Sequence, residues 1–97
     1  MATVLVVEDE PKMLRLLEMN LAEEGYKVRT AADAEAGLKL FREHRIDVVL
    51  TDLKLPGMGG LEFLEAVKRA DSRIPVIVMT AYGTVETAVE AMKAGAS

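Results

Sequence analysis

Four short runs rich in β-branched and aliphatic residues alternate with longer segments of helical periodicity, and this alternation leaves few possible folds. The runs are TVLVV, KVRTA, DVVLT and PVIVM, which begin at Thr3, Lys27, Asp47 and Pro75. A repeated order of strand, helix and strand is typical of parallel sheets whose two faces are both covered by helices. We therefore predict an α/β fold built on one parallel sheet.

Apolar residues between and after these runs recur every three to four positions, which predicts a helix following each run. Pro11 favours a helix start, and Gly25 ends that helix before the second run. Asp33 is a favoured cap for a second helix, which we expect to finish near His44 and Arg45. The remaining helices are expected over Gly60 to Arg69 and over TVETAVEAMKAGA, which begins at Thr84.

Length and composition limit the chain to one small domain, residues 1–97. Its net charge is -4 and it has no cluster of Lys and Arg, so we expect no direct binding of nucleic acid. The chain contains no Cys, which excludes disulfides and zinc thiolate sites. No apolar run approaches the ~18 residues of a membrane span, and the acidic start lacks a signal-peptide core. We therefore expect a cytoplasmic protein that does not enter a membrane.

Polar residues follow three of the predicted strands at the point where each strand ends. Glu8 and Asp9 come after the first strand, Asp52 follows the third, and Thr80 follows the fourth. The carboxyl ends of parallel strands form the edge at which open α/β sheets bind ligands. If the first and third strands are neighbours, three carboxylates converge there, and a cation or a proton must relieve their repulsion. Oxygen ligands without His or Cys suit Mg²⁺.

A pocket of this composition supports phosphoryl transfer. A metal-bound carboxylate can attack phosphorus and form an aspartyl-phosphate, while a nearby hydroxyl donates to the arriving phosphoryl oxygens. Each residue also has a simpler interpretation. Asp9 is a favoured helix cap, Glu8 alone suggests surface charge, Asp52 before a Pro-Gly pair suits a turn, and Thr80 suits a turn or a cap. The order of the residues at successive strand ends favours a site over these separate roles.

Three segments of the chain together resemble the receiver domain of bacterial two-component response regulators. They are VLVVEDEP, VVLTDLKLPGMGGLEFL and IPVIVMTAYGTVETAVEAMKAGA. Within the last of these, the segment AYGTVETAV is most similar to receivers of alternative-sigma-factor activators. The resemblance implies a flavodoxin-like, doubly wound sheet with four strands in the order 2-1-3-4. It also implies that Asp52 is the phosphoacceptor, that Glu8 and Asp9 are the acid pair, that Asp9 and the Lys54 backbone carbonyl help to hold Mg²⁺, and that Thr80 is the switch hydroxyl.

The function implied by this resemblance is signalling rather than enzymatic turnover. A sensor histidine kinase would phosphorylate Asp52 with Mg²⁺, and Thr80 would then move the surface of the fourth helix to control an output. A phosphohydrolase is a weaker alternative, because its nucleophile is expected in an Asp-x-Asp motif after the first strand, where this chain has Glu8 and Asp9 in adjacent positions.

The chain also departs from the family pattern. Glu8 replaces the commoner Asp, and the chain stops at Ser97, where a family receiver continues into a fifth strand with a Lys and a fifth helix. We therefore expect a receiver that is incomplete at its carboxyl end and a homo-oligomer that forms through the edge of strand Val76 to Met79 or by exchange of the last helix. The sequence leaves open whether an effector domain has been removed, and whether the chain acts only as a folding or oligomerisation module.

Overall fold

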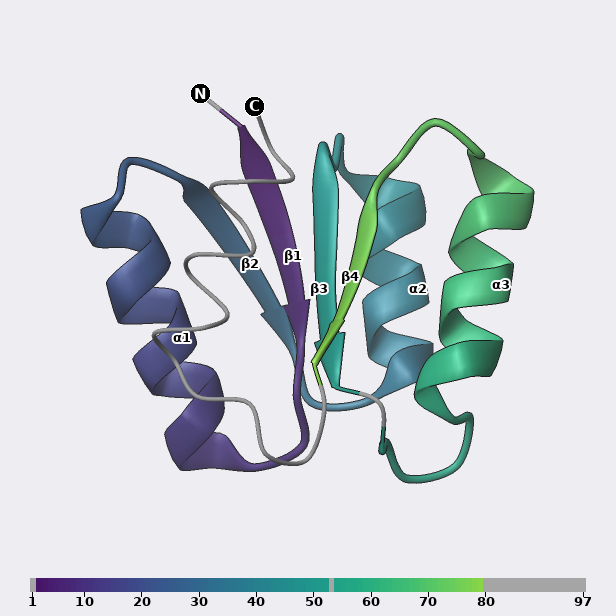
Figure 1. Ribbon diagram of the computed structural model, residues 1–97, viewed down its shortest axis with the longest axis horizontal. Coiled ribbons are helices and arrows are strands. Elements are labelled where there is room, and N and C mark those ends of the chain that lie inside the picture. Colours follow the sequence, from purple (N-terminus) through teal and green to yellow (C-terminus); the bar gives the residue numbers. More distant parts are fainter. Residues whose placement is uncertain (1, 53, 80–97) are drawn as a thin grey trace.

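The computed structural model describes residues 2–52 and 54–79, which form four strands and three helices (Figure 1). Thr80 and the helix expected from Thr84 lie outside the described residues. The described elements are β1 (Thr3–Val7), α1 (Pro11–Glu23), β2 (Lys27–Ala31), α2 (Ala34–Glu43), β3 (Val48–Asp52), α3 (Gly60–Ala70) and β4 (Val76–Met79).

The strands form one parallel sheet in the order β2-β1-β3-β4, which confirms the expected fold class. Predicted bounds differ by one or two residues at several places, and β3 extends to Asp52, one residue beyond the expected Thr51. β3 begins at Val48 rather than Asp47, because the Asp47 side chain accepts a hydrogen bond from the Thr3 backbone N–H at 2.8 Å and bonds outside the ladder. β4 begins after Pro75, which has no N–H for the ladder, and α3 continues one residue further to Ala70.

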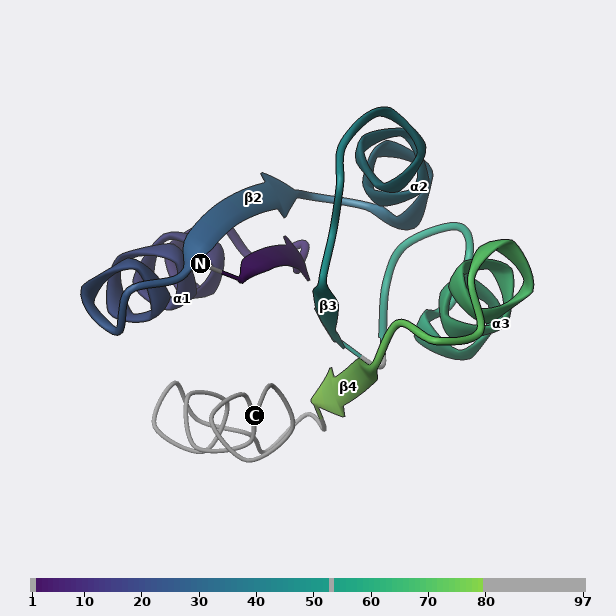
Figure 2. The ribbon, with the colours of Figure 1, turned by 90° about the horizontal axis from the view of Figure 1, so that it is seen from above.

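Helices cover both faces of the sheet, with α1 on one side and α2 and α3 on the other (Figure 2). Leu5 and Val7 of β1 belong to the core beneath α2 and α3, whereas Val4 and Val6 belong to the core beneath α1. All four side chains are fully buried. The continuously apolar sequence of β1 is therefore explained by a strand whose alternate side chains enter two different cores.

α2 lies very close to β1 because a glycine faces the sheet. A Cβ atom at Gly37 would come within 2.9 Å of Val7 Cγ2 and within 3.2 Å of the Phe63 ring. The first of these distances is too short for carbon atoms in contact, so a side chain here would push α2 away from β1. Gly37 thus helps to fix the last residue of β1, directly before Glu8.

The N-terminus of α1 is capped by Glu10, whose carboxylate accepts hydrogen bonds from the backbone N–H groups of Lys12 and Met13. The simpler interpretation of Asp9 as the helix cap is therefore wrong. Pro11 occupies the first turn of the helix, which places the cap on the residue immediately before it. Asp33, by contrast, caps α2 as predicted, by accepting from the Ala36 N–H at 2.8 Å.

None of the described helices has the length and apolar character that crossing a membrane requires.

Candidate functional site

The register between the two central strands brings the acidic residues together. β1 and β3 pair in parallel with Val7 beside Thr51, so the next residues along the two strands, Glu8 and Asp52, are also neighbours. Side chains alternate along a strand, and Asp52 therefore extends from the face that carries Leu50, the face covered by α1. The backbone N–H of Glu8 donates to the Ala31 carbonyl of β2 at 3.1 Å and holds the chain in line beyond β1.

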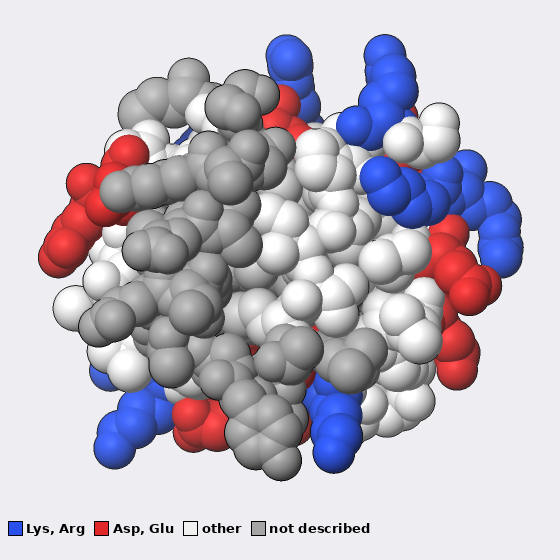
Figure 3. All heavy atoms as spheres, viewed as in Figure 1, with Lys and Arg blue, Asp and Glu red and all other residues white. Residues whose placement is uncertain are grey.

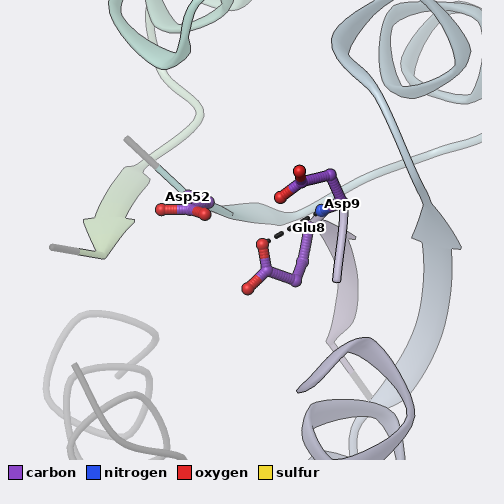
Figure 4. A group of neighbouring side chains, drawn as sticks. All are labelled: Glu8, Asp9 and Asp52. Atoms are coloured by element: carbon purple, nitrogen blue, oxygen red, sulfur yellow. Dashed lines mark hydrogen bonds between the residues drawn. The ribbon is translucent and has the colours of Figure 1, made fainter. Parts of the chain in front are cut away.

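Three carboxylates meet at this edge of the sheet. One carboxylate oxygen from each of Glu8, Asp9 and Asp52 can be chosen so that all three lie within 4.8 Å of one another. Figure 4 shows that Glu8 and Asp9 come from the end of β1 and Asp52 from the end of β3. The convergence predicted from the sequence is thus confirmed for all three acids.

Glu8 is buried, with 7% of its surface exposed, and is not the surface charge of the simpler interpretation. Burial raises the pKa of its carboxyl from 4.5 to about 7. The hydrogen bond to the Asp52 side chain contributes to this rise in pKa, as do the negative charges of Asp52 and Asp9. The Asp9 backbone N–H, which donates to Glu8 Oε2 at 3.0 Å, acts in the opposite direction and lowers the pKa. Near neutral pH the Glu8 carboxyl is therefore partly protonated.

This shift also affects stability. The folded state holds the Glu8 proton up to about pH 7, whereas the unfolded chain releases it near pH 4.5. The stability that protonated Glu8 contributes is fully present below pH 4.5 and is lost as the pH rises through about 7. The shift corresponds to about 3 kcal/mol of destabilisation of the ligand-free protein at alkaline pH.

Asp52 is held by groups on both sides of it in the chain. Its carboxylate accepts a long hydrogen bond from the Lys54 backbone N–H at 3.4 Å, and its carbonyl accepts one from the buried Thr51 hydroxyl at 3.1 Å. The first contact is that of an Asx turn, so the turn interpretation of Asp52 is also correct. Gly57, further along the same loop, has φ +72°, a conformation that favours glycine. Asp52 therefore both forms a turn with Lys54 and belongs to the acidic cluster.

The donor set fits a hard divalent cation. It consists of carboxylate oxygens, and His and Cys are absent from it, as Mg²⁺ prefers. A cation would relieve the repulsion among the carboxylates, which adds to the effect of burial in raising the pKa of Glu8. Lys54, whose backbone carbonyl is expected to be a further oxygen ligand, lies two residues beyond Asp52 in the chain. Thr80, the predicted switch hydroxyl, lies outside the described residues.

The sequence matches the response regulator receiver domain family over residues 4–97, and the chain belongs to this family. It is 41% identical to the regulatory protein AtoC of Escherichia coli over 93 residues, which are 96% of this chain and 20% of that protein. The chain thus spans about a fifth of the length of this relative.

Solved structures of receivers have the same fold. The response regulator TrrA of Thermotoga maritima in complex with Mg²⁺-BeF is 35% identical, with a TM-score of 0.81 over 93% of this chain and 83% of that one. TrrA in complex with the histidine kinase ThkA is matched with a TM-score of 0.80 at 35% identity, over 91% of this chain and 80% of that one. The family and the flavodoxin-like architecture expected from the sequence are both confirmed.

The pKa of Glu8 generates a prediction about pH and metal binding. Mg²⁺ binding to the ionised pocket should require loss of the Glu8 proton, so the dissociation constant should be about tenfold larger at pH 6 than at pH 8. Isothermal titration with MgCl₂ at the two pH values measures this change. The Glu8→Gln variant cannot ionise at this position, and its weaker binding should vary little between pH 6 and pH 8. A parent protein whose affinity is equal at both pH values would contradict the assignment of Glu8.

Proposed function

We propose that residues 1–97 form one receiver domain and that Asp52 is its phosphoacceptor. The observation that carries the proposal is the position of Asp52, at the end of a central strand and within 4.8 Å of two other carboxylates. An Asp52 oxygen would attack the phosphorus atom of the donor and form a new O–P bond. The bond from phosphorus to the leaving group would break, and the leaving group would depart with that electron pair.

Glu8, Asp9, Asp52 and the Lys54 carbonyl would hold Mg²⁺ in this proposal. The ion supplies positive charge toward the phosphoryl oxygens and the bound carboxylates. Glu8 would act as a metal ligand and would not bond to phosphorus. Its proton would have to leave before the ion binds. The structure of the relative TrrA in complex with Mg²⁺-BeF supports Mg²⁺ as the ion proposed for this pocket.

The partner proposed for this pocket is a sensor histidine kinase, and the complex of the relative TrrA with the histidine kinase ThkA supports a kinase of this class. Phosphorylation would then change the position of Thr80 and of the segment after it, which would control an effector in the cytoplasm. Relatives that include transcriptional regulatory proteins favour transcription as the process controlled. In this account the domain receives a signal and has no turnover of its own on a free substrate.

The proposal predicts the modified residue. Acetyl phosphate with Mg²⁺ should add one phosphoryl group to the parent chain and none to Asp52→Ala, because that variant lacks the attacking oxygen. Intact-mass spectrometry measures the modified fraction. The matched control is Asp71→Ala, which removes a carboxylate at the amino-terminal side of β4, and it should be modified like the parent. Equal modification of Asp52→Ala and the parent would contradict the proposal.

A second function, self-association through β4, is favoured by the exposure of that strand. β4 is the last strand of the described sheet, and its four residues are all only partly buried. Ile77 and Met79 extend toward the core beneath α1. Figure 3 shows that the middle of the face on which β4 lies carries no Lys, Arg, Asp or Glu among the described residues. An uncharged strand edge of this kind pairs readily with another strand.

We therefore propose a homo-oligomer that forms through Val76–Met79, or by exchange of the segment after it between chains. Sedimentation velocity at about 100 μM, well above a micromolar dissociation constant, should show dimers or larger species. Val78→Lys places a charge on this strand and should shift the protein toward monomer, with circular dichroism as the control for folding. A folded parent protein that stays monomeric at this concentration would contradict the proposal.

A further inference from the structure

The acidic pocket has no cationic partner among the residues that the structure describes. The two ion pairs of the described part of the chain lie just before β3 and just after α3, at the edge of the sheet opposite the pocket. The three carboxylates therefore depend on a proton or on a bound cation for compensation of their charge.

A phosphoryl group makes this balance worse. Glu8 and Asp9 each contribute one negative charge when they are ionised, and a phosphoryl group on Asp52 contributes about two more at neutral pH. One Mg²⁺ compensates about two of these charges, so the occupied pocket keeps a net charge of about −2. An additional protein cation near the phosphoryl oxygens would be strongly favoured.

Lys54 is the basic residue closest to Asp52 in the chain. Its backbone N–H donates to Asp52 Oδ1 at 3.4 Å, and this bond keeps the two residues together in the turn. Lys54 is exposed, and its ammonium group has no hydrogen-bond or ion-pair partner in the described ranges 2–52 and 54–79. A flexible four-carbon stem allows this group to turn toward the phosphoryl oxygens without any change of the backbone.

We propose that the Lys54 ammonium group is an electrostatic clamp on the phosphoryl group that Asp52 accepts, an inference that rests on the function proposed above. As the Asp52 oxygen bonds to phosphorus and the P–O bond to acetate breaks, acetate leaves with the electron pair. The three remaining phosphoryl oxygens keep their negative charge, and Lys54, which stays protonated throughout, would compensate it. This role of the side chain is separate from the role of the Lys54 carbonyl as a metal ligand.

The clamp has opposite effects on two ligands, and this distinguishes it from a structural role. The positive charge of Lys54 attracts the phosphoryl donor but repels Mg²⁺ from the empty pocket. Lys54→Met keeps the backbone carbonyl and most of the stem, and removes the charge. It should slow phosphorylation by acetyl phosphate about fivefold and tighten Mg²⁺ binding about twofold, as expected of a charge that is partly screened by solvent.

The experiment compares the parent chain with Lys54→Met, Lys54→Arg and Lys27→Met. Lys27 is an exposed lysine at the amino-terminal end of β2, so its variant is the control for the loss of one positive charge far from the pocket. Phosphorylation rates come from intact-mass time courses with acetyl phosphate, Mg²⁺ affinities from calorimetry, and folding from circular dichroism. Lys54→Arg and Lys27→Met should both behave like the parent. At about 1 M salt, where the Debye length is about 3 Å, the difference between Lys54→Met and the parent should nearly disappear.

Equal phosphorylation rates of Lys54→Met and the parent at low salt would overturn the clamp and leave Asp52 as the phosphoacceptor. A slower rate together with weaker Mg²⁺ binding would also overturn it, because that combination indicates a damaged pocket. If the parent itself accepts no phosphoryl group at Asp52, the proposed function fails, and the clamp fails with it.

Discussion

The convergence of three carboxylates at the ends of two neighbouring strands, with Glu8 buried among them, is the constraint on which the rest of this structure depends. Two unit charges 4.8 Å apart repel each other by about 3 kcal/mol at the effective dielectric constant typical of protein sites. Apolar packing opposes this repulsion. β1 and β3 carry seven fully or almost fully buried aliphatic side chains, namely Val4, Leu5, Val6, Val7, Val48, Val49 and Leu50. Burial of each of these side chains stabilises the folded state by about 2 kcal/mol, before the loss of conformational entropy is subtracted.

The packing of the sheet thus holds the acids in an arrangement that they would not adopt by themselves. Glu8 responds by keeping its proton to about pH 7, and the ligand-free pocket is poised between a proton and a metal ion. Unfavourable contacts between charged groups, held in place by the surrounding core, are common at functional sites. Glu10, rather than Asp9, caps α1, and this leaves the Asp9 carboxylate available to the pocket.

Most of the fold could be predicted from the sequence because the two periodicities are clear. The apolar runs that become β1 and β3 have no competing helical interpretation, and the parallel order follows from the alternation with helices. The cap of α1 was predicted less well, although Pro11 was a usable signal, since a proline in the first turn points to the preceding residue as the cap. The start of β3 was missed because the bond between Asp47 and Thr3 joins residues distant in sequence.

The residues of the site could be predicted from their order at strand ends, but their protonation could not. The pKa of Glu8 depends first on desolvation, and desolvation depends on how the strands and helices pack around that carboxylate. The exposure of Lys54 and its bond to Asp52 also follow from the turn geometry, which the sequence only indicates. Local patterns identify the residues, and tertiary packing determines their chemistry.

A crystal structure of the chain with Mn²⁺ in place of Mg²⁺ and with beryllium fluoride as a phosphoryl mimic tests the central claim most directly. The account predicts an anomalous manganese peak bound by oxygens of Glu8, Asp9 and Asp52 and by the Lys54 carbonyl, and a beryllium atom bonded to an Asp52 oxygen. Manganese bound at another place, or beryllium fluoride bonded to a different carboxylate while Asp52 stays free, would contradict it.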